Sequence, residues 1–281
     1  MNQEGDIRKF NPWNYNNINI PNKFIKKLLN KHNIEPIDYS LYQKACIHKS
    51  YKKRSIEDIP KERYIEMEPC PKGCMDLCDD DNERIEFLGD SLLYASISDY
   101  LYKRYPKQGE GFMTKLRMKL VNNRSLGTLI KKMKLNKYLI ISKHFEEKCD
   151  GRNNLKILGG MMEAWICAVY LDYKNSNRDA WNAVKGFIQN IFESYCDFAK
   201  IITSDYNYKE QLMKYYQKTF NQTPKYKMIS SVGALHERIF TMGVLDINNN
   251  VVSQASARCK KTAEQIASRL ALNKFGVNTI E

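Results

Sequence analysis

Residues 82–93 have the sequence Asn-Glu-Arg-Ile-Glu-Phe-Leu-Gly-Asp-Ser-Leu-Leu, which is the most specific pattern in this chain. Its acids Glu83, Glu86 and Asp90 are separated by three and then four residues. At about 100° per residue, this spacing places them within roughly 60° of one another on a helical face. Like charges on one face repel, and a bound cation relieves that repulsion. Because magnesium and manganese prefer carboxylate oxygens, the segment predicts either a metal site or a solvated acidic face.

Apolar residues continue at helical spacing beyond this segment and predict almost continuous helix over residues 82–201. The run Met161–Leu171 is apolar except at Glu163, which indicates a buried helix. Residues 1–20 are polar and rich in asparagine, so we expect a flexible N-terminal arm there. The first domain, residues 21–201, is therefore predicted to be all-helical, and the chain as a whole mainly α.

An acidic segment stands out against the formal net charge of +13 of the whole chain. Residues 56–81 hold nine Asp or Glu against three Lys or Arg, and we interpret residues 51–81 as an acidic insertion. Its cysteines are Cys70, Cys74 and Cys78. Zinc usually takes four ligands, often with tighter cysteine pairs, and no fourth ligand is evident. We therefore expect a solvated loop without structural zinc. The rest of the chain is strongly basic, so we expect it to bind a polyanionic partner.

Several classes of protein are excluded by composition. The longest apolar stretch is about half of a membrane span, so no transmembrane segment is expected. The N-terminus lacks the charged start and apolar core of a secretory signal, and the eight cysteines are expected to be free thiols. These observations predict an intracellular, non-secreted protein, without deciding between cytoplasm and nucleus.

The period of the apolar pattern changes near residue 205. A helical segment, three strand-like runs and a second helical segment follow in the order 208–220, 226–229, 239–245, 251–252 and 260–273. In the last helix the residues expected to face inward are Ala263, Ile266, Ala267, Leu270 and Ala271. Residues 205–277 are therefore predicted to form a separate α+β domain with the order α-β-β-β-α.

The string at residues 82–93 closely resembles the signature of the ribonuclease III family. The resemblance extends from about Tyr39 to the C-terminus and includes segments 45–50, 110–123 and 156–172. It implies a magnesium-dependent endonuclease, with manganese as a substitute, that cuts double-stranded RNA as a homodimer. The products would carry short 3′ overhangs, as expected of an RNA-processing enzyme.

The same resemblance assigns roles to individual residues. Glu86, Asp90 and Glu163 would be the catalytic metal ligands, and Glu83 would be a supporting catalytic acid. Phe87 would lie in the homodimer contact. The family normally has an aspartate three residues before the second-helix glutamate, and this chain has Gly160 there.

Gly160 leaves two functions open. In the first, water fills the missing coordination position and cleavage survives at a lower level. In the second, the chain is a catalytically impaired relative that binds and sequesters double-stranded RNA. A ribosome-associated structural relative is a third class, which the three remaining acids disfavour.

The C-terminal domain resembles a double-stranded-RNA-binding domain. Gly233, His236 and Phe240 fit its first strand turn, and Lys260 and Lys261 fit the start of its last helix. Two lysines at a helix N-terminus add charge to exposed amides and the helix dipole, which favours phosphate binding. In the first helix, Met213 and Lys214 occupy positions where the family tends to have polar residues that contact the minor groove. RNA contacts there are expected to be weaker and less selective.

Overall fold

The computed structural model describes residues 11–53, 67–203, 207–234 and 237–277. The chain divides into two compact units, residues 1–197 and 198–281, and each is described by itself. No helix within the described ranges is long and apolar enough to cross a membrane.

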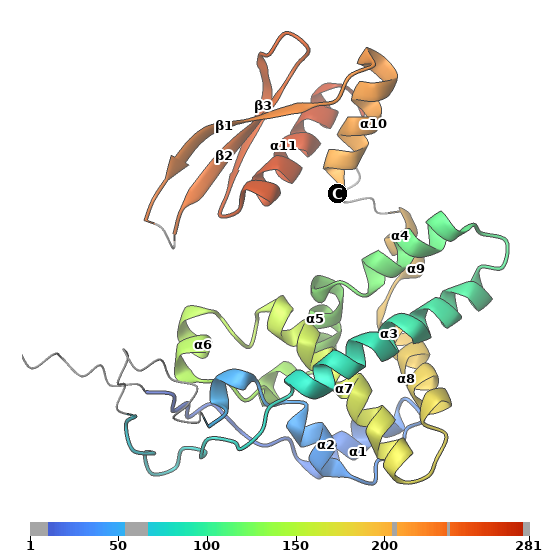
Figure 1. The fold of residues 1–281 in the computed structure, drawn as a ribbon, viewed down its shortest axis with the longest axis vertical. Coiled ribbons are helices and arrows are strands. Elements are labelled where there is room, and N and C mark those ends of the chain that lie inside the picture. The colour runs from blue at the N-terminus through green and yellow to red at the C-terminus, as the bar shows by residue number, and fades with distance from the viewer. Residues whose placement is uncertain (1–10, 54–66, 204–206, 235–236, 278–281) are drawn as a thin grey trace, which may run out of the picture. The chain divides into compact units, whose positions relative to one another are not determined.

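The first unit is helical, as predicted (Figure 1). Short 3-10 helices at Lys49–Tyr51 and Asn136–Tyr138 lie between α-helices of this unit. The helices are α1 (Asn22–Asn30), α2 (Tyr39–Lys44), α3 (Glu83–Arg104), α4 (Glu110–Leu120), α5 (Asn123–Lys132), α6 (Lys143–Lys148), α7 (Leu155–Asn175) and α8 (Ala180–Tyr195).

Helix α7 is the centre of this unit and packs against α3, α5 and α8 (Figure 1). The predicted buried helix is confirmed over residues 161–169, where every side chain except Glu163 is buried. Trp165 is fully enclosed and contacts the Tyr42 ring. The mostly apolar sequence of residues 161–169 reflects contact with neighbours on several sides, which excludes water from this part of α7.

The segment before α1 differs from the expected flexible arm. Within residues 11–20, Trp13 is buried, and its indole nitrogen donates to the Glu68 carbonyl. The side-chain amides of Asn14 and Asn17 both donate to the Ile141 carbonyl. These asparagines satisfy backbone groups of the folded unit, so polarity here reflects buried hydrogen bonding and not solvation. Residues 1–10 lie outside the described ranges.

The acidic insertion is fastened to the helical unit at its ends. The Lys53 backbone N–H donates to the Cys78 carbonyl at 2.8 Å, and the Cys78 N–H donates to the Tyr51 carbonyl at 3.0 Å. The Tyr51 side chain is fully buried. Lys53 also forms an ion pair with Asp79 at 2.6 Å. Residues 54–66 lie outside the described ranges.

The second unit contains α9 (Phe198–Thr203), α10 (Tyr208–Phe220), β1 (Lys225–Val232), β2 (Ile239–Leu245), β3 (Val251–Ala257) and α11 (Lys260–Lys274). The strands form one antiparallel sheet in the order β1-β2-β3, and α10 and α11 cover one face of it (Figure 1). The predicted α-β-β-β-α order is confirmed. In α11, however, Ile266 is only partly buried and Leu270 is 38% exposed. The side chains that this helix buries are Ala263, Ala267, Ser268, Ala271 and Leu272.

Candidate active site

The beginning of α3 is held by hydrogen bonds of Asn82 and Asp81 to backbone groups, which fix the orientation of the helix start. Asn82, the residue before the helix, donates from its N–H to the Ile47 carbonyl at 2.9 Å and from its side chain to the Ala45 carbonyl. The Asp81 carboxylate accepts from the Glu83 N–H at 3.0 Å. A carboxylate at this position satisfies an otherwise unpaired amide of the first turn. The helix therefore presents its acids in one fixed direction.

Helices α3 and α7 touch backbone to backbone where they cross. A Cβ built on Gly89 would lie 1.9 Å from the Glu163 carbonyl oxygen, a distance no side chain tolerates. Only glycine permits this approach. The crossing places Asp90, the next residue of α3, beside Glu163 of α7.

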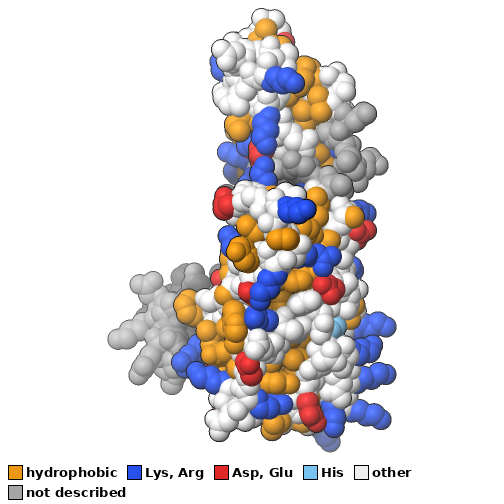
Figure 2. All heavy atoms as spheres, turned by 90° about the vertical axis from the view of Figure 1, so that its right-hand side faces the viewer, with side chains coloured by type: hydrophobic (Ala, Val, Ile, Leu, Met, Phe, Trp, Pro, Cys, Tyr) orange, Lys and Arg blue, Asp and Glu red, His pale blue; other side chains and the backbone are white. Residues whose placement is uncertain are grey.

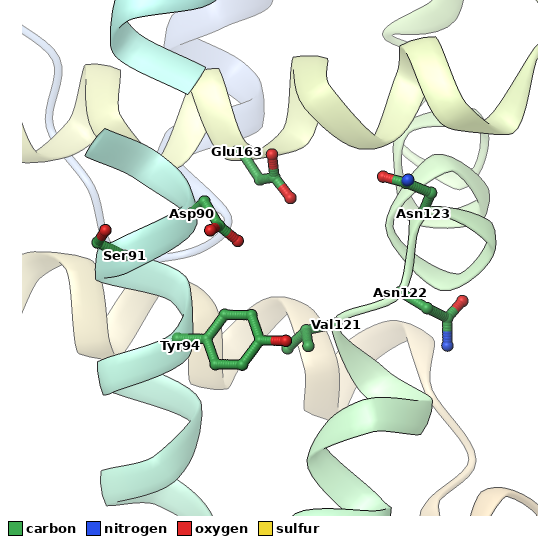
Figure 3. A pocket seen from close by; sticks show the side chains of 7 residues that line it. All are labelled: Asp90, Ser91, Tyr94, Val121, Asn122, Asn123 and Glu163. Carbon is green, nitrogen blue, oxygen red and sulfur yellow. The ribbon is translucent and has the colours of Figure 1, made fainter. Parts of the chain in front are cut away.

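Asp90 and Glu163 point into one pocket with a volume of about 570 Å³ (Figure 3). The other lining residues come from α3 and from the junction of α4 with α5. They are Ser91, Tyr94, Val121, Asn122 and Asn123. The structure thus brings together two acids that are far apart in the sequence, as the family resemblance required.

Burial and nearby like charges raise the pKa values of two glutamates at this site. Burial and, to a smaller extent, the charges of Asp90 and Glu86 together raise the pKa of Glu163 to about 7. Burial also raises the pKa of Glu86, with Glu83 the largest charge acting on it. Glu83 is half exposed and forms an ion pair with Lys49 at 2.6 Å. Both shifts reflect partial burial together with repulsion between neighbouring carboxylates.

The donor set fits a divalent metal in its chemistry. Hard carboxylate oxygens suit magnesium and manganese, and a cation would relieve the repulsion that raises both glutamate pKa values. Within the described residues, no three His, Cys, Asp or Glu side chains converge as a finished ligand cluster. Asp90 and Glu163 line the pocket, whereas Glu86 is not among its lining residues but lies close enough to raise the pKa of Glu163. The three acids are therefore candidate ligands, and not a closed coordination shell.

Gly160 lies on α7 against the carboxylate of Glu86. A Cβ on residue 160 would be 2.6 Å from the carboxyl carbon and from both oxygens of Glu86. Glu86 therefore fills the space of the side chain that the family normally carries at this position.

In the second unit, Lys260 and Lys261 occupy the first turn of α11, as predicted. The Lys260 ammonium lies 5.4 Å from the centre of the Phe240 ring. Cys259 precedes them, and the backbone N–H groups of Thr262 and Lys261 lower the pKa of its thiol. These amides therefore favour an anion at this helix start.

Met213, Lys214, Gly233 and His236 are the other residues that the sequence assigned to the RNA-binding domain. Met213 is 38% exposed on α10, and Lys214 forms an ion pair with Glu210 at 2.6 Å. Gly233 adopts a φ of +104°, which suits glycine at the turn after β1. His236 lies outside the described ranges, so its assignment stays a prediction.

Sequence reasoning missed Tyr94 as a residue that lines the acidic pocket. Tyr94 lies four residues after Asp90 on α3, and this spacing would have placed it on the same helical face. Lys49 was also missed as the ion-pair partner of Glu83, because that contact joins segments on either side of the insertion.

The fold and the site define a helical domain with a crossed-helix acidic pocket, followed by a small α+β domain. A family model described as Ribonuclease-III-like matches residues 38–192, and one described as Double-stranded RNA binding motif matches residues 208–275. The chain belongs to the ribonuclease III family.

Named relatives agree with this membership. The chain is 35% identical over 271 residues to a protein of Acanthamoeba polyphaga mimivirus named "Probable ribonuclease 3", covering 94% of this chain and 47% of the relative. The chain thus spans about half the length of that relative. It is 37% identical over 199 residues to "Ribonuclease 3" of Natranaerobius thermophilus, covering 70% of this chain and 81% of the relative.

A solved structure of the nuclease domain of ribonuclease III from Campylobacter jejuni is also similar. It is 26% identical, with a TM-score of 0.47, over 63% of this chain and 99% of that domain.

Proposed function

We propose that this chain is a metal-dependent endoribonuclease that cuts double-stranded RNA as a homodimer and leaves short 3′ overhangs. The observation that carries the proposal is the crossing of α3 and α7 at Gly89, which places Asp90 and Glu163 in one pocket. Three of the four acids expected to bind metal are present, and named relatives are ribonucleases. These facts favour cleavage over the binding-only alternative.

Glu86, Asp90 and Glu163 would hold a magnesium ion, for which manganese would substitute. The ion would activate water and stabilise the charge that develops on the phosphate and the leaving oxygen. Glu83 would act as a supporting acid, kept in place by its ion pair with Lys49. With its pKa raised to about 7, Glu163 would release a proton on binding a cation near neutral pH.

Phe87 would take part in the homodimer contact. Its side chain is 80% exposed on α3, and the neighbouring Leu88 is 37% exposed. Large apolar side chains so exposed beside a functional site are typical of an interface. Substitution Phe87→Ala should shift the chain toward monomer in analytical ultracentrifugation.

The second unit would bind the duplex. Such domains contact two minor grooves and the phosphates between them. Residues 205–281 hold eleven Lys or Arg against six acids. Figure 2 shows Lys and Arg side chains spread over the whole face in view, among hydrophobic and uncharged ones. Lys260 and Lys261 would contact phosphates, with His236, Met213 and Lys214 as further contacts. Action on such RNA is expected inside the cell, in the cytoplasm or the nucleus.

The test is Glu163→Gln in the full chain, assayed with long duplex RNA and magnesium. The neutral amide keeps the shape of the side chain but loses the charge that holds a hard cation, so cutting should be abolished while duplex binding stays nearly intact. The matched control is Glu193→Gln, which changes a surface acid on α8 paired with Arg104. Equal cutting by Glu163→Gln and the parent would refute the proposed metal site.

A further inference from the structure

We propose that Tyr94 and Asn123 form an uncharged wall of the catalytic pocket that recognises the ribose of the substrate. The inference rests on the proposed function and identifies which part of the RNA is recognised beside the cut. The pocket has acidic side chains on Asp90 and Glu163, whereas Tyr94 and Asn123 face the same space from α3 and the start of α5 (Figure 3).

Tyr94 is held in place through its ring and its backbone. The Arg117 guanidinium lies 5.3 Å from the ring centre, and its Nη1 donates to the Ser98 hydroxyl at 2.7 Å. The Ser98 hydroxyl in turn donates to the Tyr94 carbonyl at 2.7 Å. A cation against an aromatic face stabilises its orientation. Among the described residues the Tyr94 hydroxyl has no hydrogen-bond partner, so a fixed ring presents a free donor to the pocket.

Asn123 offers an amide that the fold does not use. Its neighbour Asn122 accepts from the Ser125 N–H at 2.9 Å and donates to two carbonyl groups of α4, so that side chain is committed to capping. The Asn123 side chain is exposed and forms no hydrogen bond with any residue of the described ranges. Its position is set by Gly159, where a Cβ would lie 2.5 Å from the Asn123 Oδ1 and 3.0 Å from its Cα.

The chemistry of this wall suits a ribose next to a phosphate. The carboxylates of the pocket repel phosphate oxygens, whereas an amide and a phenol donate hydrogen bonds to them without competing for a cation. The Asn123 amide can also accept from a hydroxyl, and so can the Tyr94 oxygen. The 2′-hydroxyl, both donor and acceptor, is the group that distinguishes RNA from DNA at a given position. The wall would therefore make cleavage depend on the 2′-hydroxyl beside the scissile bond.

The experiment measures kcat/KM of the full chain with magnesium on two duplex substrates. One is all-ribose, and the other carries a single 2′-deoxynucleotide next to the mapped cut. The proteins are the parent, Tyr94→Phe, Asn123→Ala and the double variant. Tyr102→Phe is the matched control, since Tyr102 lies on α3 but lines a different pocket between α3 and α4. Thermal midpoints establish that each variant is folded.

We expect the 2′-deoxy substitution to lower kcat/KM of the parent and of Tyr102→Phe about tenfold, as loss of one or two hydrogen bonds would. The double variant should lose about as much on the all-ribose duplex and show no further loss on the 2′-deoxy duplex. Each single variant should lose part of the discrimination. Parental sensitivity to the 2′-deoxy substitution in the double variant would overturn the inference while leaving the nuclease proposal intact. No cutting of either duplex by the parent would overturn both.

Discussion

Glu86 occupies the space into which a side chain on residue 160 would project, with both of its carboxylate oxygens 2.6 Å from the position of that missing Cβ. The two residues belong to different helices, α3 and α7. The lack of a side chain at Gly160 therefore leaves the space that the Glu86 carboxylate occupies. Any side chain introduced at residue 160 must first displace the end of Glu86, which is flexible enough to move.

Gly160→Asp should raise magnesium-dependent cleavage by about tenfold, the lower end of the range for groups that orient a metal site. Gly160→Ala is the matched control, because it displaces Glu86 without adding a carboxylate. Without metal, Gly160→Asp should have the lower thermal midpoint of the two, since it adds a fourth acid to a crowded site. Magnesium should reverse that order. Equal activity of the parent and both variants would mean that the three existing acids suffice.

The stability of the metal-free protein should depend on pH through Glu163. Its pKa rises from the ordinary value of 4.5 to about 7, so the folded chain binds more protons than the unfolded chain between these values. The free energy of unfolding should therefore fall as pH rises through this window. Thermal midpoints in chelator at pH 5, 6 and 7 should show the fall in the parent relative to Glu163→Gln.

That comparison also removes an opposing contribution. Burial lowers the pKa of His32, so this residue stabilises the folded chain increasingly as pH rises toward 6.5. Both proteins contain His32, so their difference removes its contribution and reports Glu163 together with its effect on the neighbouring acids. Magnesium at constant concentration should stabilise the parent more at pH 7 than at pH 5, and a pH-independent difference would contradict the assignment.

Replacing Lys260 and Lys261 with alanine should weaken duplex binding and flatten its salt dependence. Each lost phosphate contact should reduce the slope of log affinity against log salt by about one. The control is Lys218→Ala with Lys274→Ala, which removes the same charge from the C-terminal turns of α10 and α11. Titrations at several salt concentrations give both quantities, and an unchanged slope would remove the start of α11 from the interface.

The cysteines of the insertion should carry no zinc. Cys70 is exposed, and the Cys74 sulfur lies 3.7 Å from the Tyr51 hydroxyl. Elemental analysis of purified protein should find zinc far below one ion per chain, and chelation should leave the thermal midpoint unchanged. Stoichiometric zinc together with a lowered midpoint after chelation would establish a structural site instead.

Shortening the insertion should be tolerated only in part. Deleting residues 56–66 should leave the thermal midpoint nearly unchanged. A deletion that extends to residue 81 should lower it clearly, because it removes the Cys78 backbone contacts with Tyr51 and Lys53 and the Asp81 cap of α3. Equal midpoints for the two deletions would show that these contacts contribute little to stability.

The sequence by itself determined the elements and most of the acids of the site. Helical spacing at residues 82–93 is a local property, because one helix fixes the directions of Glu83, Glu86 and Asp90. The change in the spacing of apolar residues near residue 205 likewise predicted the second domain, since strands and helices bury side chains at different intervals. Glu163 was assigned from the family pattern, and the apolar residues around it predicted that its helix is buried.

Only the tertiary structure decided which residues meet. The crossing at Gly89, the position of Glu86 against Gly160 and the approach of Gly159 to Asn123 depend on how distant segments pack. The same holds for the anchoring of Asn14 and Asn17 to the Ile141 carbonyl, where polar sequence had predicted a loose arm. Periodicity records which face of an element is apolar, but close contacts depend on the shapes of both partners, and one segment's sequence contains only one of them.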